Sequence, residues 1–118
     1  MAKLRFSIVL DSGARIGPGK VALLESIQAT GSISAAARAM GMTYKRAWLL
    51  LDSINQAFLE PVTSAAPGGA SGGGASLTAF GVELLQRYRR IEQGLPRLAA
   101  DELQALDGRA RPQAGSKV

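Results

Sequence analysis

Four consecutive residues near the middle of the sequence combine two hydroxyl groups with two cations, and these are Thr43, Tyr44, Lys45 and Arg46. A guanidinium can donate two parallel hydrogen bonds to O6 and N7 of guanine, and hydroxyl and ammonium groups bind phosphate oxygens and base edges. The four side chains could therefore contact a nucleic acid. The less favoured alternative is a helix N-cap followed by two solvated cations. The helices and strands predicted around these four residues help to decide between nucleic-acid contact and a purely structural role.

The composition removes most catalytic chemistry. The sequence contains no cysteine and no histidine, which excludes thiolate metal sites, cysteine nucleophiles and histidine general bases. The nine acidic residues are scattered rather than grouped. The glycine-rich stretches lack the Lys-Ser or Lys-Thr pair of a phosphate-binding loop. We therefore expect no enzyme activity, no cofactor and no metal site.

Charge and length favour a small domain with a polyanionic partner. The 118 residues carry 14 Lys and Arg against 9 Asp and Glu, a net charge of +5. This length suits one compact domain. Because the sequence has neither a bilayer-crossing apolar run nor a signal-peptide pattern, we expect a cytoplasmic protein with no membrane partner.

The pattern of apolar residues predicts the elements that position the four polar residues. Alternation over residues 3–10 predicts a strand, and helical spacing predicts helices over residues 20–29, 33–40 and 44–59. Thr43 would cap the third of these helices. A short helix, a tight turn and a longer helix form a helix-turn-helix, whose second helix enters the major groove with its N-terminal turn.

Small residues stand where two crossing helices require them. Gly41 tolerates positive φ in the turn, and Ala37 and Ala47 allow the two backbones to approach. Ser32 and Ser34 open the second predicted helix, where a phosphate could bind, although a cap explains Ser32 equally well. We expect these two serines to make supporting DNA contacts.

A glycine-rich segment follows the third helix. Residues 60–77 predict a β-hairpin whose tip is rich in glycine. Gly72 and Gly73 would let the backbone approach the sugar-phosphate chain of DNA. Simple linker flexibility is the alternative explanation for this tip.

The last predicted helix carries an apolar stripe. Thr78 would cap a helix from residue 79 to about 93, and Gly94 and Pro96 would bend or divide it before a helical stretch over 97–106. The stripe could pack on the chain's own core or on a second copy, and we expect a homodimer. The alternative is a module that docks another protein through this stripe. The stripe comprises Phe80, Leu84, Tyr88, Ile91, Leu95 and Leu98.

Three arginines flank this stripe. Arg87, Arg89 and Arg90 are expected to be solvated or to pair with Glu83 and Glu92 rather than to touch DNA.

These motifs together resemble a known family. The segment IGPGKVALLESIQATGSISAAARAMGMTYKRAWLLLDSINQAF, the glycine-rich stretch and SLTAFGVELL are similar to the N-terminal DNA-binding domain of ModE-type molybdate-responsive regulators. The likeness covers about residues 4–93 and includes the pair Asn55 and Gln56. LysR-type regulators are similar only in the helix-turn-helix part.

The resemblance implies a homodimeric winged-helix repressor or activator with residues 43–46 at duplex DNA. The expected fold is α+β and mostly helical, with an N-terminal strand, a helix-turn-helix over about 33–59, a wing over about 60–77 and dimerisation helices over about 79–106. We expect residues 1–107 to form this domain and residues 108–118 to be a disordered tail.

Full-length relatives carry C-terminal oxyanion-binding domains, and this sequence ends in a polar tail where they would begin. An oxyanion effector is therefore not expected from these residues.

Overall fold

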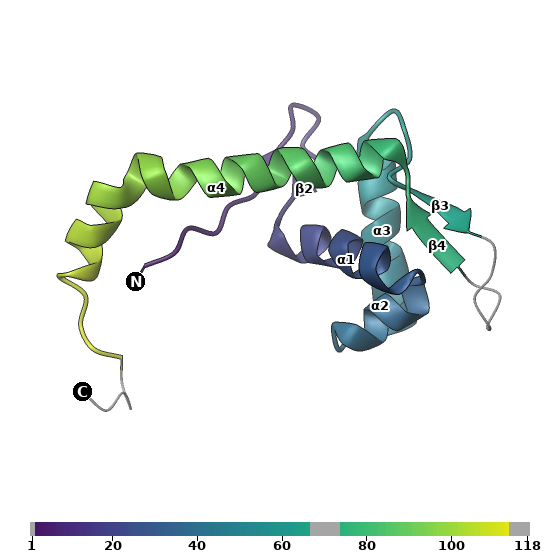
Figure 1. Cartoon of the computed structure of the whole chain (residues 1–118), viewed down its shortest axis with the longest axis horizontal. Coiled ribbons are helices and arrows are strands. Elements are labelled where there is room, and N and C mark those ends of the chain that lie inside the picture. Colours follow the sequence, from purple (N-terminus) through teal and green to yellow (C-terminus); the bar gives the residue numbers. More distant parts are fainter. Residues whose placement is uncertain (1, 67–73, 114–118) are drawn as a thin grey trace.

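The structure is a computed structural model that describes residues 2–66 and 74–113. Its elements, shown in Figure 1, are β1 (Ile8–Val9), β2 (Arg15–Ile16), α1 (Pro18–Thr30), α2 (Ile33–Ala39), α3 (Tyr44–Ala57), β3 (Thr63–Ala66), β4 (Gly74–Leu77) and α4 (Ala79–Asp107). The described part is thus mainly helical, with two small antiparallel sheets.

The N-terminal strand is shorter than the alternating pattern predicts. Only Ile8 and Val9 pair, with Ile16 and Arg15, across a tight turn. Pairing ends there because β2 runs directly into Pro18, which starts α1 and has no amide to donate. Ile8 belongs to the apolar face of the alternating pattern, and it is half-buried and packs against the core as that pattern predicts.

Local signals fix the first two helices where the sequence predicts them. Pro18 occupies the first turn of α1, and Gly31 ends it with φ +78°, donating its amide to the Ile27 carbonyl at 2.8 Å. The Ser32 hydroxyl then caps α2 by accepting from the Ala35 amide at 2.9 Å.

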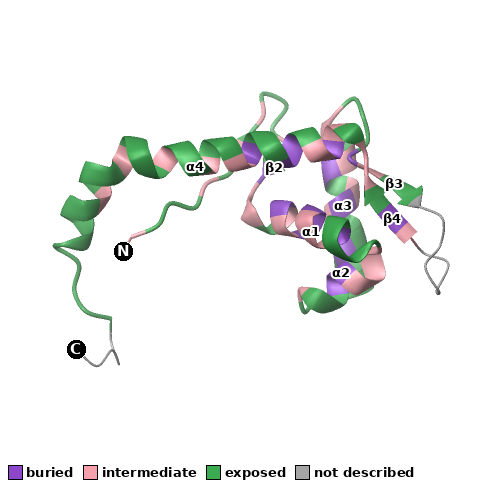
Figure 2. Cartoon of the chain, in the orientation of Figure 1, coloured by how far each residue is buried: buried purple, intermediate pink, exposed green. Residues whose placement is uncertain are grey.

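The core lies between α1, α2 and α3 and the first half of α4. Figure 2 shows buried segments on these helices, whereas the second half of α4 is mostly exposed. Ala37 and Ala47 are buried, as expected for small residues at a close helix crossing. Eight large side chains are almost completely buried, namely Tyr88, Ile16, Leu23, Leu24, Ile27, Ile54, Val21 and Val62.

The third helix ends at Ala57 rather than near residue 59. Phe58 is extended, with φ −126° and ψ 163°, and packs edge to face on Phe80 with ring centroids 5.1 Å apart. The Asn55 side chain accepts a hydrogen bond from the Val62 amide at 2.7 Å. This bond folds the chain back immediately after α3 and stops the helix.

The predicted hairpin is present and is tied to the helices. β3 and β4 pair from Thr63 with Leu77 to Ala66 with Gly74. The Ala75 amide donates to the Gly31 carbonyl at 2.8 Å, which joins β4 to the turn between α1 and α2. The expected DNA-contacting glycines Gly72 and Gly73 lie outside the described residues.

The fourth helix is continuous through Pro96. Thr78 caps it by accepting from the Gly81 amide at 3.0 Å, and it runs for 29 residues. Figure 1 shows that it crosses above the other helices and turns in direction in its C-terminal part. A proline removes one backbone hydrogen bond and crowds the preceding turn, so it bends α4 without dividing it. Residues 108–113 follow without helix or strand, and the rest of the expected tail lies outside the described residues.

Candidate nucleic-acid interface

The start of α3 has the cap that the sequence predicts. Thr43 is extended, and its hydroxyl oxygen accepts from the Arg46 amide at 3.1 Å. This contact uses the oxygen as an acceptor and leaves the hydroxyl hydrogen available to a phosphate. The cap also exposes the first turn of α3, because the helix begins at the surface.

The next three side chains are exposed. Tyr44, Lys45 and Arg46 all lie on the surface, and Tyr44 is 55% exposed. Among the residues that the structure describes, no acidic side chain pairs with Lys45 or Arg46. These two cations are therefore free to bind an anion from outside the chain.

The turn before α3 fixes the direction of this helix. Gly41 has φ +67° and donates to the Arg38 carbonyl at 3.1 Å, and the Met42 amide donates to the Ala37 carbonyl at 3.0 Å. Only glycine adopts such a φ without strain. Two consecutive backbone hydrogen bonds thus set the angle between α2 and α3.

The two serines at the start of α2 accept hydrogen bonds from groups within the chain. Ser32 caps the helix, and the Ser34 hydroxyl accepts from the Arg38 guanidinium at 3.2 Å. Both serines are half-buried. They stand at the start of the helix that precedes α3 and, as at Thr43, accepting a hydrogen bond leaves each hydroxyl hydrogen available to a phosphate.

Two large apolar residues of α3 are exposed. The sequence alone favours packing over stacking on a partner for Trp48, but Trp48 is 47% exposed, and Leu49 is 51% exposed. Helical geometry explains Leu49, because two residues after buried Ala47 correspond to about 200° around the axis. The spacing of four residues from Lys45 is the sequence signal for the outer position of Leu49.

The apolar stripe of α4 divides into a buried part and an exposed part. Leu84 and Tyr88 belong to the chain's own core, and Phe80 is half-buried against Phe58. These side chains are expected at a dimer interface from the sequence, but the chain's own core, together with Phe58 and Phe6, already covers them. The outer part of the stripe contains Ile91, Leu95 and Leu98, which are 42% exposed, half-buried and 83% exposed, respectively.

Tyr88 attaches the N-terminal segment to α4. Its ring stacks on Phe6 with centroids 4.4 Å apart, and its hydroxyl donates to the Phe6 carbonyl at 2.9 Å. Burial raises the pKa of the Tyr88 hydroxyl above its ordinary value.

Two of the three arginines that flank the stripe are paired, as the sequence predicts, and the third, Arg90, is exposed. Arg87 contacts Glu83 at 2.7 Å and Arg89 contacts Glu92 at 2.6 Å. Arg89 also donates from Nε to Glu25 of α1 at 3.0 Å, a partner that local spacing could not reveal. The hydrogen bond to Glu25 raises the pKa of Arg89. This ion pair links α4 to α1 and leaves the free cations of α3 as the stronger candidates for DNA contact.

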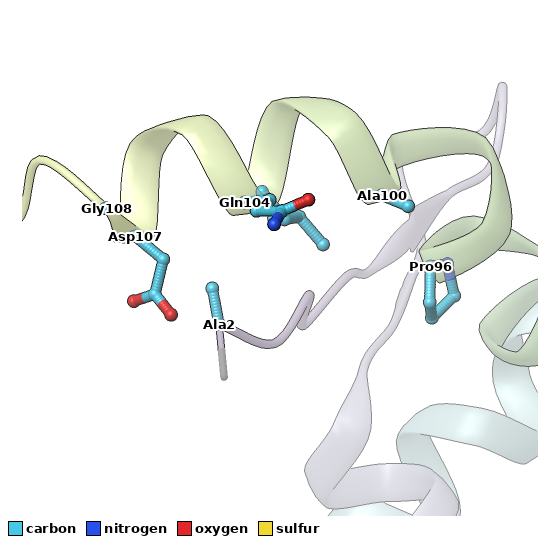
Figure 3. Close-up of a pocket in the computed structure, with 7 residues that line it drawn as sticks. Ala2, Pro96, Ala100, Gln104, Asp107 and Gly108 are labelled. Atoms are coloured by element: carbon cyan, nitrogen blue, oxygen red, sulfur yellow. The ribbon is translucent and has the colours of Figure 1, made fainter.

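A hollow of about 460 Å³ lies away from α3, between Ala2 and the bent part of α4 (Figure 3). Its polar lining consists of Gln104 and Asp107, beside Pro96, Ala100 and other small or apolar residues.

Within residues 2–66 and 74–113, no cluster of acidic or other ligating side chains could hold a metal ion. Of the described helices, none combines the length and apolarity needed to span a bilayer.

Curated proteins similar to this chain include transcriptional regulators named ModE and molybdenum-pterin-binding proteins. The chain is 46% identical over 101 residues to the molybdenum-pterin-binding protein MopB of Rhodobacter capsulatus, which covers 85% of this chain and 37% of MopB. It is 36% identical over 88 residues to the molybdenum transport protein ModE of Azotobacter vinelandii, covering 75% of this chain and 33% of the relative.

A third relative is named for its action on DNA. The DNA-binding transcriptional dual regulator ModE of Escherichia coli strain K12 is 35% identical over 92 residues, covering 78% of this chain and 35% of that protein. The chain spans about a third of the length of the curated relatives it matches. No family model matches the chain.

Proposed function

We propose that this chain is a ModE-like transcriptional regulator that binds specific sequences in double-stranded DNA. The observation that carries the proposal is the exposed first turn of α3, where Lys45 and Arg46 have no acidic partner among the described residues. The similarity to the DNA-binding regulator ModE supports the same class of function. In this proposal the protein acts by binding alone, without catalysis or a cofactor.

The proposed architecture is a winged helix-turn-helix in which α3 enters the major groove. A groove about 12 Å wide accommodates an α-helix, and the N-terminal residues of that helix contact base edges. β3 and β4 would form the wing, with its base held by the bond from Ala75 to Gly31. The wing would then follow the adjacent sugar-phosphate backbone.

We keep molybdenum chemistry outside this proposal. The names of MopB and MopA refer to molybdenum-pterin binding by those proteins, and this chain spans 37% and 31% of them. The cations and the tyrosine hydroxyl in the first turn of α3 are exposed and do not line an enclosed anion site.

Selection from random duplex DNA tests the proposed function directly. An enriched sequence is expected at moderate salt, and its affinity should fall by about 0.9 log units per neutralised phosphate for each tenfold rise in salt. Trp48 is the single tryptophan and is 47% exposed on α3. Its fluorescence should therefore become less accessible to acrylamide when DNA binds. Failure to enrich any sequence would refute sequence-specific binding.

Arg46 provides the sharpest test of base contact. Arg46→Ala is expected to weaken binding to the selected site by about 1–3 kcal/mol, because a bidentate contact to guanine would be lost. The loss on random DNA should be smaller. Affinity is measured by anisotropy titration, with Arg90→Ala as the control because Arg90 is an exposed arginine on α4. Equal losses for both variants would reduce Arg46 to a general electrostatic contribution.

We further propose a homodimer formed through the outer part of α4. Ile91, Leu98 and Leu106 are exposed apolar side chains on this one helix, and burying them against a second copy would be favourable. A two-fold dimer would place two α3 helices on paired half-sites.

Leu98→Ala is expected to weaken dimerisation by at least about tenfold, because each copy loses buried apolar surface. Sedimentation equilibrium measures the change. Leu59→Ala, which alters a fully exposed leucine outside α4, should leave the dissociation constant unchanged. A monomer at every concentration of the unaltered chain would exclude the dimer.

A further inference from the structure

Three large apolar side chains are exposed together on six consecutive residues of α3. Tyr44 is 55% exposed, Trp48 is 47% exposed and Leu49 is 51% exposed. Single exposed apolar residues are common on protein surfaces, whereas a contiguous group marks a contact surface. We call these three residues the α3 apolar patch.

The neighbours of the α3 apolar patch indicate its partner. Lys45 lies in the row of Leu49, one helical turn before it, and Arg46 is the next residue. Both cations are exposed and lack an acidic partner in the described part of the chain. The partner must therefore present negative charge close to apolar groups.

The DNA major groove presents this combination. Its phosphates are anionic, and the C5-methyl group of thymine is the apolar group on the base edges. A leucine side chain has no hydrogen-bonding group, so it distinguishes bases only through such a methyl group. Asp52 lies three residues beyond Leu49 and its carboxylate would repel phosphates, which restricts favourable contact to the first turns of α3.

The position of Leu49 suits base contact rather than packing. It lies about 200° around the helix from Ala47, which is completely buried. It is thus close to the direction that points away from the core, in the same row as Lys45. A partner surface that contacts Lys45 and Arg46 therefore also contacts Leu49.

We propose that Leu49 is a specificity-determining residue that contacts the C5-methyl group of a thymine in the target DNA. This inference rests on the proposed function and adds a base preference to it. Trp48 and Tyr44 would border the contact and exclude water from it.

Replacing thymine by uracil tests the proposal, because uracil lacks only the methyl group. In the site enriched by selection, each thymine is replaced in turn by deoxyuridine and the affinity is measured by anisotropy. The unaltered chain should lose about fourfold in affinity at one or two positions, as expected for burial of one methyl group. Leu49→Ala should bind the thymine site more weakly and show no further loss with uracil at those positions.

Leu59→Ala is the matched control, since Leu59 is fully exposed outside α3. It should give the same uracil profile as the unaltered chain. Circular dichroism verifies that both variants fold, which the exposure of the two leucines favours.

The outcomes separate this inference from the proposed function. If no sequence is enriched, DNA recognition itself is refuted. If a site is enriched but every uracil is neutral, or Leu49→Ala keeps the full uracil effect, Leu49 does not contact a thymine methyl. Unchanged DNA affinity of Leu49→Ala would instead assign the patch to another partner.

Discussion

Tyr88→Ala is expected to lower the free energy of unfolding by about 3–5 kcal/mol, the usual range for truncating a large buried aromatic residue. Tyr88 is 1% exposed, stacks on Phe6 and donates its hydroxyl hydrogen to the Phe6 carbonyl. Its removal would leave a cavity beneath α4 and release the N-terminal segment. Urea denaturation followed by circular dichroism measures the change.

Tyr88→Phe separates the ring from the hydroxyl. This variant keeps the stacking and loses one hydrogen bond, so a loss of about 1 kcal/mol is expected. Hydrogen exchange should show that the N-terminal segment remains docked in Tyr88→Phe and is released in Tyr88→Ala. Similar stability of the alanine variant and the unaltered chain would contradict the packing described for α4.

Gly81→Ala is expected to destabilise the fold by about 3 kcal/mol, the upper end of the usual cost of over-packing. A Cβ at this position would lie 2.1 Å from the Val62 carbonyl oxygen. The same oxygen accepts from the Thr78 amide at 3.0 Å, so moving it would disturb the junction between the hairpin and α4. Thermal and urea denaturation measure this loss.

Gly94→Ala is the matched control on the same helix. No atom lies within 4 Å of a Cβ built at Gly94, apart from its chain neighbours and the local helix backbone. Alanine should stabilise the helix here by about 0.5–1 kcal/mol, because glycine is a poor helix former. The same change from glycine to alanine is therefore expected to lower the free energy of unfolding at Gly81 and to raise it at Gly94. Equal effects would contradict the close contact between Gly81 and Val62.

The helices follow from signals that are local in the sequence. Ser32, Thr43 and Thr78 cap α2, α3 and α4, and each cap is made to an amide three residues later. Gly31 and Gly41 adopt the positive φ that their turns require. Such features depend on a few adjacent residues, so residue types and spacing were sufficient to predict them.

The packing of α4 depended on contacts that spacing cannot reveal. Tyr88 bonds to Phe6 across 82 residues, and Arg89 bonds to Glu25 across 64. An apolar stripe looks the same in sequence whether its own chain or a second copy covers it. The division of the stripe between core and surface therefore emerged only from the three-dimensional arrangement.

At the candidate interface, the cap and the cations were predictable and the apolar contribution was not. Thr43, Lys45 and Arg46 are polar residues at a helix start, which is a local signal. Leu49 stands in a run of three leucines that includes buried Leu51, and its spacing of four from Lys45 indicates a shared row on the helix but not what covers that row. Trp48 is exposed for a related reason, because smaller residues already fill the crossing with α2.

The second half of α4 projects beyond its attachment to the core. Leu84 and Tyr88 pack in the core, and the ion pair between Arg89 and Glu25 adds a bond to α1 at the end of this packed part. From Arg89 to the last residue of α4 the helix path is about 27 Å long, at about 1.5 Å per residue, and it bends near Pro96. A rotation of about 5° where α4 leaves the core would displace the far end by about 2 Å. In the proposed dimer, the contacts between α4 and the core would thus affect the separation of the two DNA-reading helices. Half-site spacing would then depend on contacts remote from every base.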